Sequence, residues 1–128
     1  MRAIVPPEMR PAYETWRMSP GLACQGFVFL TGVSGMSLAG IVSPEPAEQI
    51  EVAFSKADRV LREGGLGFAD VVEMTSYHVG LQAHLQEFMA IRARYVQEPY
   101  PAWTAIEVAG FVAPRIVVEL RIIARQPG

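Results

Sequence analysis

Two segments near the C-terminus constrain the fold most, because both alternate in the way that β-strands do. Residues 115–125 place apolar side chains at every second position: Ile116, Val118, Leu120 and Ile122. Glu119 and Arg121 fall on the opposite face of the same segment, because successive side chains of a strand point to opposite sides. Residues 102–109 predict a second strand, which follows a proline-rich stretch. The face that carries Glu119 and Arg121 is therefore either a packed ion pair or the wall of a site.

Two amphipathic helices and three further strands are expected upstream. Residues 46–63 repeat apolar side chains at helical spacing, and Gly64-Gly65 suits the C-terminal stop. Residues 81–96 predict a second helix, which Pro99 and Pro101 separate from the strand that follows. Residues 1–12 are expected to be irregular, with a short edge strand near 13–18. The further strands are expected at 22–25, 27–31 and 71–79.

The order of these elements predicts an α+β fold, a two-layer sandwich in which two helices cover one face of a mixed sheet. The whole chain, residues 1–128, is expected to be one domain. No helix is left to cover the other face of the sheet. The chain is also apolar, with 51% hydrophobic and 19% charged residues. Both observations favour an oligomer that buries the open face.

Composition excludes several classes of function. The net charge is −2, the arginines are scattered and Lys56 is the only lysine, so a nucleic-acid partner is not expected. No apolar run reaches the length of a membrane-spanning helix, so no membrane partner is expected. Cys24 is the only cysteine, which leaves no zinc motif and no intramolecular disulfide. We therefore expect a cytoplasmic protein without a metal.

Three side chains are candidates for chemistry, each with a structural alternative. Glu119 would have a raised pKa if buried and unpaired, and could then relay a proton or orient water; the alternative is a structural ion pair. Trp103 would wall a pocket or form part of a protein interface. His78 would be a general base or a hydrogen-bonded sheet residue. His84 and Lys56 are expected to face solvent.

Several segments together resemble the Rid family, also known as the YjgF or L-PSP endoribonuclease-like family. The resemblance runs from about Met18 to Ala124 and is carried by Phe27–Gly32, by 61–72, by Tyr100–Val108 and by Val118-Glu119-Leu120. It implies a chorismate-mutase-like fold in which three subunits pack their sheets inward, with clefts between neighbouring chains. Such proteins hydrolyse reactive enamines and imines to a keto acid and ammonia without a metal or cofactor.

The resemblance also implies which residues would form the site. Glu119 matches the glutamate that positions the attacking water, and Gly32, next to Thr31, matches a turn glycine that makes a backbone contact. Trp103 stands at the position of an arginine that clamps the substrate carboxylate. Met18 stands where a tyrosine is usual, and Met89 where an asparagine is usual.

An indole cannot replace the charge and the five donors of a guanidinium. Arg121 would restore a cation near Glu119 only from a different direction. The sequence therefore predicts an enamine or imine deaminase-type hydrolase acting on a non-carboxylate or atypical small metabolite. The alternative is a non-catalytic protein that binds a small apolar or aromatic molecule in the same cleft. The scattered basic residues argue against a ribonuclease.

Overall fold

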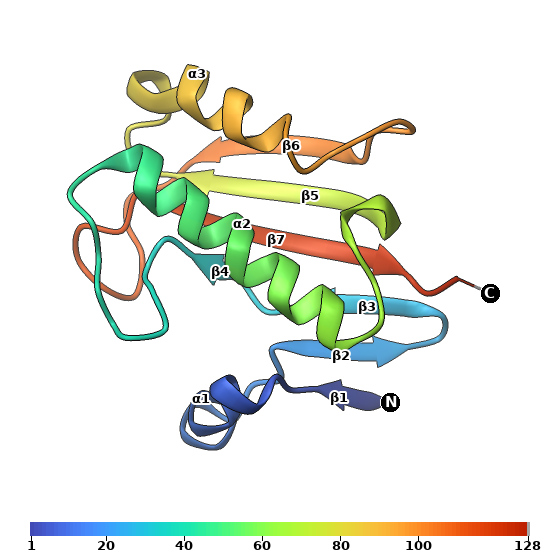
Figure 1. The fold of residues 1–128 in the computed structure, drawn as a ribbon. Helices are drawn as coiled ribbons and strands as arrows, with labels where there is room; N and C mark the ends of the chain where they lie inside the picture. The colour runs from blue at the N-terminus through green and yellow to red at the C-terminus, as the bar shows by residue number, and fades with distance from the viewer. Residues whose placement is uncertain (128) are drawn as a thin grey trace.

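The computed structural model describes residues 1–127 and consists of one seven-stranded sheet with two long helices on the same face (Figure 1). The helices are α1 (Arg10–Trp16), α2 (Pro46–Glu63) and α3 (Leu81–Arg92), with short 3-10 helices at Pro7–Met9 and Phe68–Asp70. The strands are β1 (Arg2–Ile4), β2 (Gly21–Cys24), β3 (Phe27–Leu30), β4 (Val33–Ser34), β5 (Val71–His78), β6 (Ala102–Glu107) and β7 (Val118–Arg125).

The strand order is β1-β2-β3-β7-β5-β6, and the short β4 pairs with β7. All pairs are antiparallel except β5 and β6, which run parallel and are joined through α3. A parallel pair needs a crossover connection, and the helix that makes it covers the sheet. The predicted α+β class, a mixed sheet under two helices, is confirmed.

Helix α2 supplies the centre of the core. Its buried stripe includes Ile50, Ala53, Phe54, Ala57, Val60 and Leu61 at the spacing that the sequence predicts. Phe54 contacts the rings of Phe68, Phe88 and Tyr95, with ring centroids 4.9 to 5.8 Å apart. This aromatic cluster joins α2 to α3, so the position of α3 over the sheet depends on it.

The register of β7 divides its side chains between two environments. Val118, Leu120, Ile122 and Ala124 are fully or almost fully buried beneath the helices. Glu119, Arg121, Ile123 and Arg125 alternate with them and therefore lie on the face that no helix covers. This open face also carries large apolar side chains that are each 40% exposed, namely Phe27, Phe29, Val72 and Ile106.

The N-terminal region differs from the sequence prediction. The edge strand lies at Arg2–Ile4 and pairs with β2, whereas residues 13–18, predicted as a strand, belong largely to helix α1. Pro11 suggested irregular structure, but it lies in the first turn of α1, where the missing N–H has no helical partner to lose. The 1–12 segment is therefore ordered, and Ile4 is part of the core.

Smaller differences concern the element ends. The segment after β3 contains the two-residue strand β4, which is not among the strands expected from the sequence. Helix α3 ends at Arg92 rather than at residue 96, and the chain continues in turns towards a cis Glu98-Pro99 bond. Helix α2 has the predicted bounds.

Candidate functional site

The carboxylate of Glu119 lies directly against Gly32. Glu119 is opposite Ser34 of β4 in the β4–β7 pairing, and Gly32 immediately precedes β4. A Cβ atom added to Gly32 would stand 2.5 Å from Glu119 Oε2, which is closer than such atoms approach one another. Glycine is therefore required here if the carboxylate is to keep this position. The structure brings these two predicted residues together.

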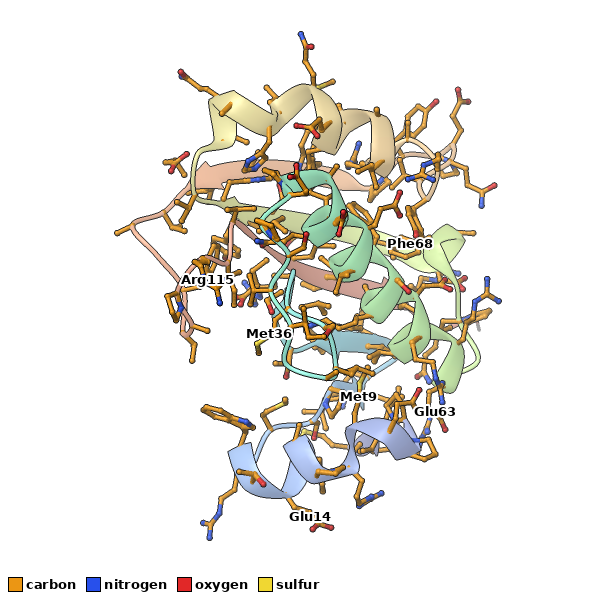
Figure 2. All side chains as sticks on the ribbon, turned by 60° about the vertical axis from the view of Figure 1, so that its left-hand side comes forward. Met9, Glu14, Met36, Glu63, Phe68 and Arg115 are labelled. Carbon is orange, nitrogen blue, oxygen red and sulfur yellow. The ribbon has the colours of Figure 1, made fainter. Side chains whose placement is uncertain are left out.

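The surroundings of Glu119 disfavour its charged form. Burial raises the pKa of the Glu119 carboxyl, while the positive charge of Lys56 acts in the opposite direction. Lys56 donates a hydrogen bond to the carbonyl oxygen of Met36, which lies in the loop after β4 (Figure 2). Burial lowers the pKa of Lys56 to about 8. The prediction that Lys56 faces solvent is wrong, because the loop around Met36 lies against this part of α2.

Thr31 and Met18 belong to the same part of the fold. The Thr31 hydroxyl donates to the Ser19 carbonyl at 2.6 Å, and the Thr31 N–H donates to the Pro20 carbonyl at 3.0 Å. These bonds fasten the end of β3 to the segment that follows Met18. The Thr31 hydroxyl thus has a structural partner in the Ser19 carbonyl. Met18, which precedes Ser19 in the chain, is half-buried.

Trp103 lies on the edge strand β6 and packs beneath α3. Its ring stacks against Phe88, with ring centroids 5.8 Å apart, and the Arg92 guanidinium lies 4.2 Å from the ring centroid. The indole Nε1–H donates to Ser76 Oγ at 2.9 Å. The ring that the sequence suggested as a wall for a flat ligand is thus covered on its helix side by two residues of α3.

A buried hydrogen-bond chain continues inward from Trp103. Ser76 Oγ is 2.8 Å from His78 Nε2, and His78 Nδ1 is 3.0 Å from His84 Nε2. An indole can only donate, so Ser76 Oγ accepts from Trp103. Burial lowers the pKa of His78 to about 4 and also lowers that of His84, so both rings are neutral at pH 7.

This arrangement decides between the alternatives for the two histidines. His78 is fully buried and hydrogen-bonded on both nitrogens, which is the structural alternative rather than the general base. His84 is only 3% exposed, so the expectation that it faces solvent is wrong. Its position explains the error, since His84, Phe88 and Ile91 form the buried stripe of α3.

One chain does not bring Trp103 and Glu119 into a common cleft. In the strand register, Trp103 is paired with Met74 on the helix-covered face. Glu119 is paired with Tyr77 on the open face. Directly paired residues point to the same side of a sheet, so the two predicted site residues lie on opposite sides.

Met89 and Arg121 divide in the same way. Met89 is 51% exposed on α3, one turn from Arg92, and so belongs with Trp103. Arg121 is exposed on the open face, two residues from Glu119. No ion pair within residues 1–127 joins Arg121 to Glu119, so the packed ion pair considered for this face is not formed in the chain.

The endoribonuclease L-PSP family profile matches residues 10–126. The chain belongs to this family, the Rid family. It is 28% identical to the RutC family protein YjgH of Escherichia coli K12 over 129 residues, covering 98% of this chain and 95% of that protein. The structure of protein YjgH superimposes with a TM-score of 0.89 at 26% identity, covering 99% and 97% of the two chains.

Two solved structures of lower identity share the fold. RidA from the Antarctic bacterium Psychrobacter sp. PAMC 21119 has a TM-score of 0.85 at 22% identity, with 97% of this chain and 99% of that chain covered. Escherichia coli TdcF with bound serine has a TM-score of 0.78 at 18% identity, with 86% and 88% covered.

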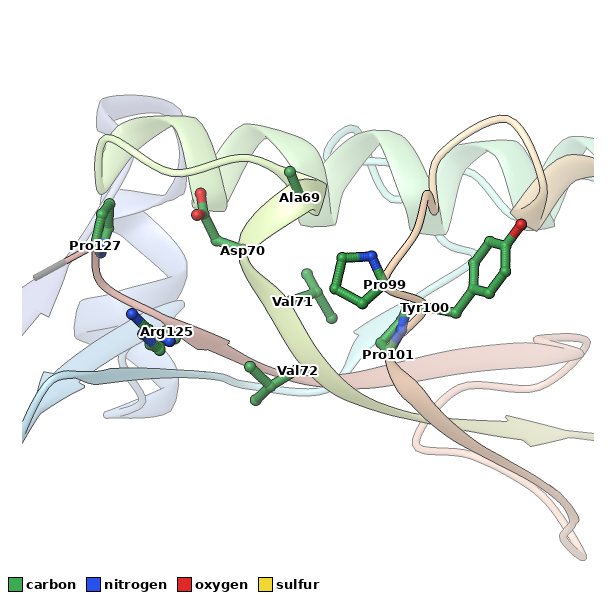
Figure 3. A pocket seen from close by; sticks show the side chains of 9 residues that line it. All are labelled: Ala69, Asp70, Val71, Val72, Pro99, Tyr100, Pro101, Arg125 and Pro127. Carbon is green, nitrogen blue, oxygen red and sulfur yellow. The ribbon is translucent and has the colours of Figure 1, made fainter.

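A cavity of about 360 Å³ lies at one end of the sheet of this Rid chain (Figure 3). It is found where β5 and β6 begin and β7 ends, whereas Glu119 is at the beginning of β7. Its lining includes Asp70, Tyr100 and Arg125 but none of the predicted site residues. We therefore assign no part of the proposed chemistry to it.

Two features are absent from residues 1–127. No group of three or more His, Cys, Asp or Glu side chains is placed to hold a metal ion. Among the helices of this region, none combines the length and the apolar character needed to cross a membrane.

Sequence reasoning missed two residues beside the site. Arg92 is not among the residues expected at the site, because its contact with Trp103 links two segments whose relative position depends on the crossover through α3. For Lys56 the sequence offers one indication of a special role, namely that it is the only lysine in the chain.

Proposed function

We propose that this Rid-family chain is an enamine or imine deaminase-type hydrolase for an atypical small metabolite. The metabolite either lacks a carboxylate or presents its anionic group elsewhere than at position 103. The observation that carries the proposal is the Glu119 carboxylate, half-buried and held against Gly32. TdcF with bound serine supports small-molecule binding by this fold.

The working form in this proposal is a homotrimer with its sheets packed inward. The uncovered sheet face with its exposed Phe27 and Phe29 supports such an assembly. The trimer would also reconcile the two halves of the site. A cleft between neighbouring chains can combine Glu119 and Gly32 of one chain with Trp103 and Met89 of the next, which one chain cannot do.

The proposed reaction requires only water. An enamine first takes a proton on carbon and becomes an imine. Water oxygen then adds to the imine carbon while Glu119 accepts a proton from that water and passes it to the nitrogen. The C–N bond of the resulting carbinolamine breaks as the hydroxyl proton is transferred to the nitrogen, so that ammonia leaves and the carbonyl forms. A raised pKa suits Glu119 to this exchange, because a general base works best with a pKa near the operating pH.

The experiment compares wild type with Glu119→Gln on a panel of imines generated in solution from amino acids and amines, with ammonia release as the readout. The panel includes 2-iminopropionate, on which we expect little activity because Trp103 replaces the clamping charge. Glu119→Gln should lower kcat about 10²- to 10⁴-fold while leaving ligand affinity unchanged.

Glu14→Gln, an exposed change of the same chemistry on α1, is the control and should leave kcat unchanged. If no imine is hydrolysed faster with wild-type protein than without it, the hydrolase proposal fails and the binding-protein alternative is favoured. A high rate with 2-iminopropionate would refute the charge argument at position 103.

A further inference from the structure

The Arg92 guanidinium has no carboxylate partner within residues 1–127. Its guanidinium lies over the Trp103 indole at 4.2 Å, and its Nε atom is buried without a hydrogen-bond partner. None of the ion pairs within residues 1–127 includes Arg92. A buried donor that lacks an acceptor is rare and costs stability, so its presence calls for an explanation.

The two arginines of α2 and one arginine just beyond α3 do find carboxylates. Arg59 pairs with Glu8 and Glu63, and Arg62 pairs with Asp58. Arg94, just two residues beyond Arg92, pairs with Glu51. Arg92 instead lies on an aromatic ring, an interaction worth about 0.5 to 2 kcal/mol, which leaves the outer edge of the guanidinium available for an anion.

The support beneath Arg92 is fixed. The Trp103 Nε1–H is bonded to Ser76, and Ser76 is bonded to the buried His78. Phe88 stacks on the same indole from the preceding turn of α3. A charge that rests on such a platform is already positioned, so binding an anion costs little further ordering.

We propose that Arg92 binds the anionic group of the ligand, and that this ligand is a small carboxylate with an apolar body. A carboxylate bound end-on to an arginine accepts from its two Nη atoms, and Nε is the only Arg92 nitrogen that is buried without a partner, so the Nη pair is the edge that a ligand can reach. Met89, exposed one turn away, provides apolar surface for the rest of the molecule. The cation is thus moved from the strand to the helix above Trp103 rather than lost.

This inference rests on the proposed function in one respect, namely that the ligand occupies the cleft beside Trp103. It identifies the atypical metabolite as one whose carboxylate is bound by Arg92, above the Trp103 indole, rather than by the side chain of residue 103.

The test measures binding of benzoate and of benzamide, a charged and a neutral ligand of nearly the same shape, by NMR titration. Wild type should bind benzoate at least about 10-fold more tightly than benzamide, which corresponds to about 1.4 kcal/mol. Arg92→Met, which keeps an apolar chain over the indole, should abolish this preference. Arg92→Lys should retain part of it, since a lysine keeps the charge without the bidentate edge. Arg62→Met, which removes an exposed arginine from α2, is the matched control and should bind like wild type.

Three results would overturn the inference: no benzoate binding by wild type, an undiminished preference in Arg92→Met, or smaller assemblies of Arg92→Met on sedimentation with unchanged benzoate affinity. The last result would show that Arg92 pairs with a carboxylate of a second copy of the chain.

The outcome is independent of the hydrolase proposal. Benzoate binding that depends on Arg92, in a protein that hydrolyses no imine, would refute the hydrolase and support the anion site. Hydrolysis that depends on Glu119, without an effect of Arg92 on benzoate binding, would support the hydrolase and refute the anion site.

Discussion

At the scale of single residues, the contact between Gly32 and Glu119 is the most exacting feature of the chain. A methyl group at position 32 would collide with the end of the Glu119 side chain rather than with backbone. The carboxylate can swing away, so the fold should tolerate the change while the geometry of the site does not. Gly32→Ala is expected to reduce kcat by about 100-fold, as a misplacement of about 1 Å can do. The melting temperature should change little.

Gly110→Ala provides the control for this prediction, because a Cβ at Gly110 meets nothing within 4 Å. Activity assays and thermal unfolding of both variants give the comparison. Wild-type activity in Gly32→Ala would show that the position of the Glu119 carboxylate is unimportant for turnover.

The sequence could predict only part of the site at this scale. Strand alternation placed Glu119 on the face opposite the core residues Val118 and Leu120, as the structure has it. It also placed Trp103 on one face of β6, but not beneath Arg92 and Phe88. Those contacts depend on where α3 lies above the sheet, and tertiary packing of this kind is not encoded in a local pattern.

At the scale of elements, the buried histidine pair joins β5 to α3 and makes that joint sensitive to acid. The pKa of His78 is lowered from 6.5 to about 4 in the folded chain, and the pKa of His84 is lowered as well. The unfolded chain therefore binds more protons between pH 6.5 and 4, so stability falls as the pH falls through that window. His78 alone should reduce the free energy of unfolding by about 2 kcal/mol between pH 7.5 and 5.

Urea unfolding at the two pH values measures this loss, and NMR of the imidazole protons identifies its source. The raised pKa of Glu119 acts in the opposite direction, so the unfolding series is repeated with Glu119→Gln. The chain has only two histidines, which keeps the assignment simple. Titration of His78 near pH 6.5 in the folded protein would contradict the prediction.

The elements themselves were predicted unevenly, for physical reasons. Helix α2 has an uninterrupted apolar stripe, a proline in its first turn and a glycine pair at its end, and its bounds were correct. Helix α1 is short and has no fully buried residue, so it lacked the periodic signal that identifies a helix. Strand β4 has only two residues, too few to show alternation.

At the scale of the whole molecule, the sheet has one face under helices and one face that no helix of residues 1–127 covers. The trimer that we propose would bury the apolar part of the open face. We expect the native protein to sediment at three times the 14.1 kDa chain mass. Phe29→Asp, which places a charge on the open face, should shift the protein towards monomers because burying an unpaired charge is costly.

Ser55→Asp adds the same charge to an exposed position of α2 and should leave the assembly unchanged. Analytical ultracentrifugation of the three proteins distinguishes these outcomes. A wild-type protein that stays monomeric at micromolar concentration would remove the intersubunit cleft, and with it the proposed meeting of Glu119 and Trp103.

The stacking of Arg92 on Trp103 gives the molecule a built-in optical reporter. The chain has two tryptophans, and the other, Trp16, is 65% exposed on α1. Indole fluorescence responds to a neighbouring charge, so an anion that arrives at the guanidinium would alter the emission of one tryptophan and leave the other unaffected. Binding of an anion at Arg92 can therefore be followed by the intrinsic fluorescence of Trp103, without attaching a dye.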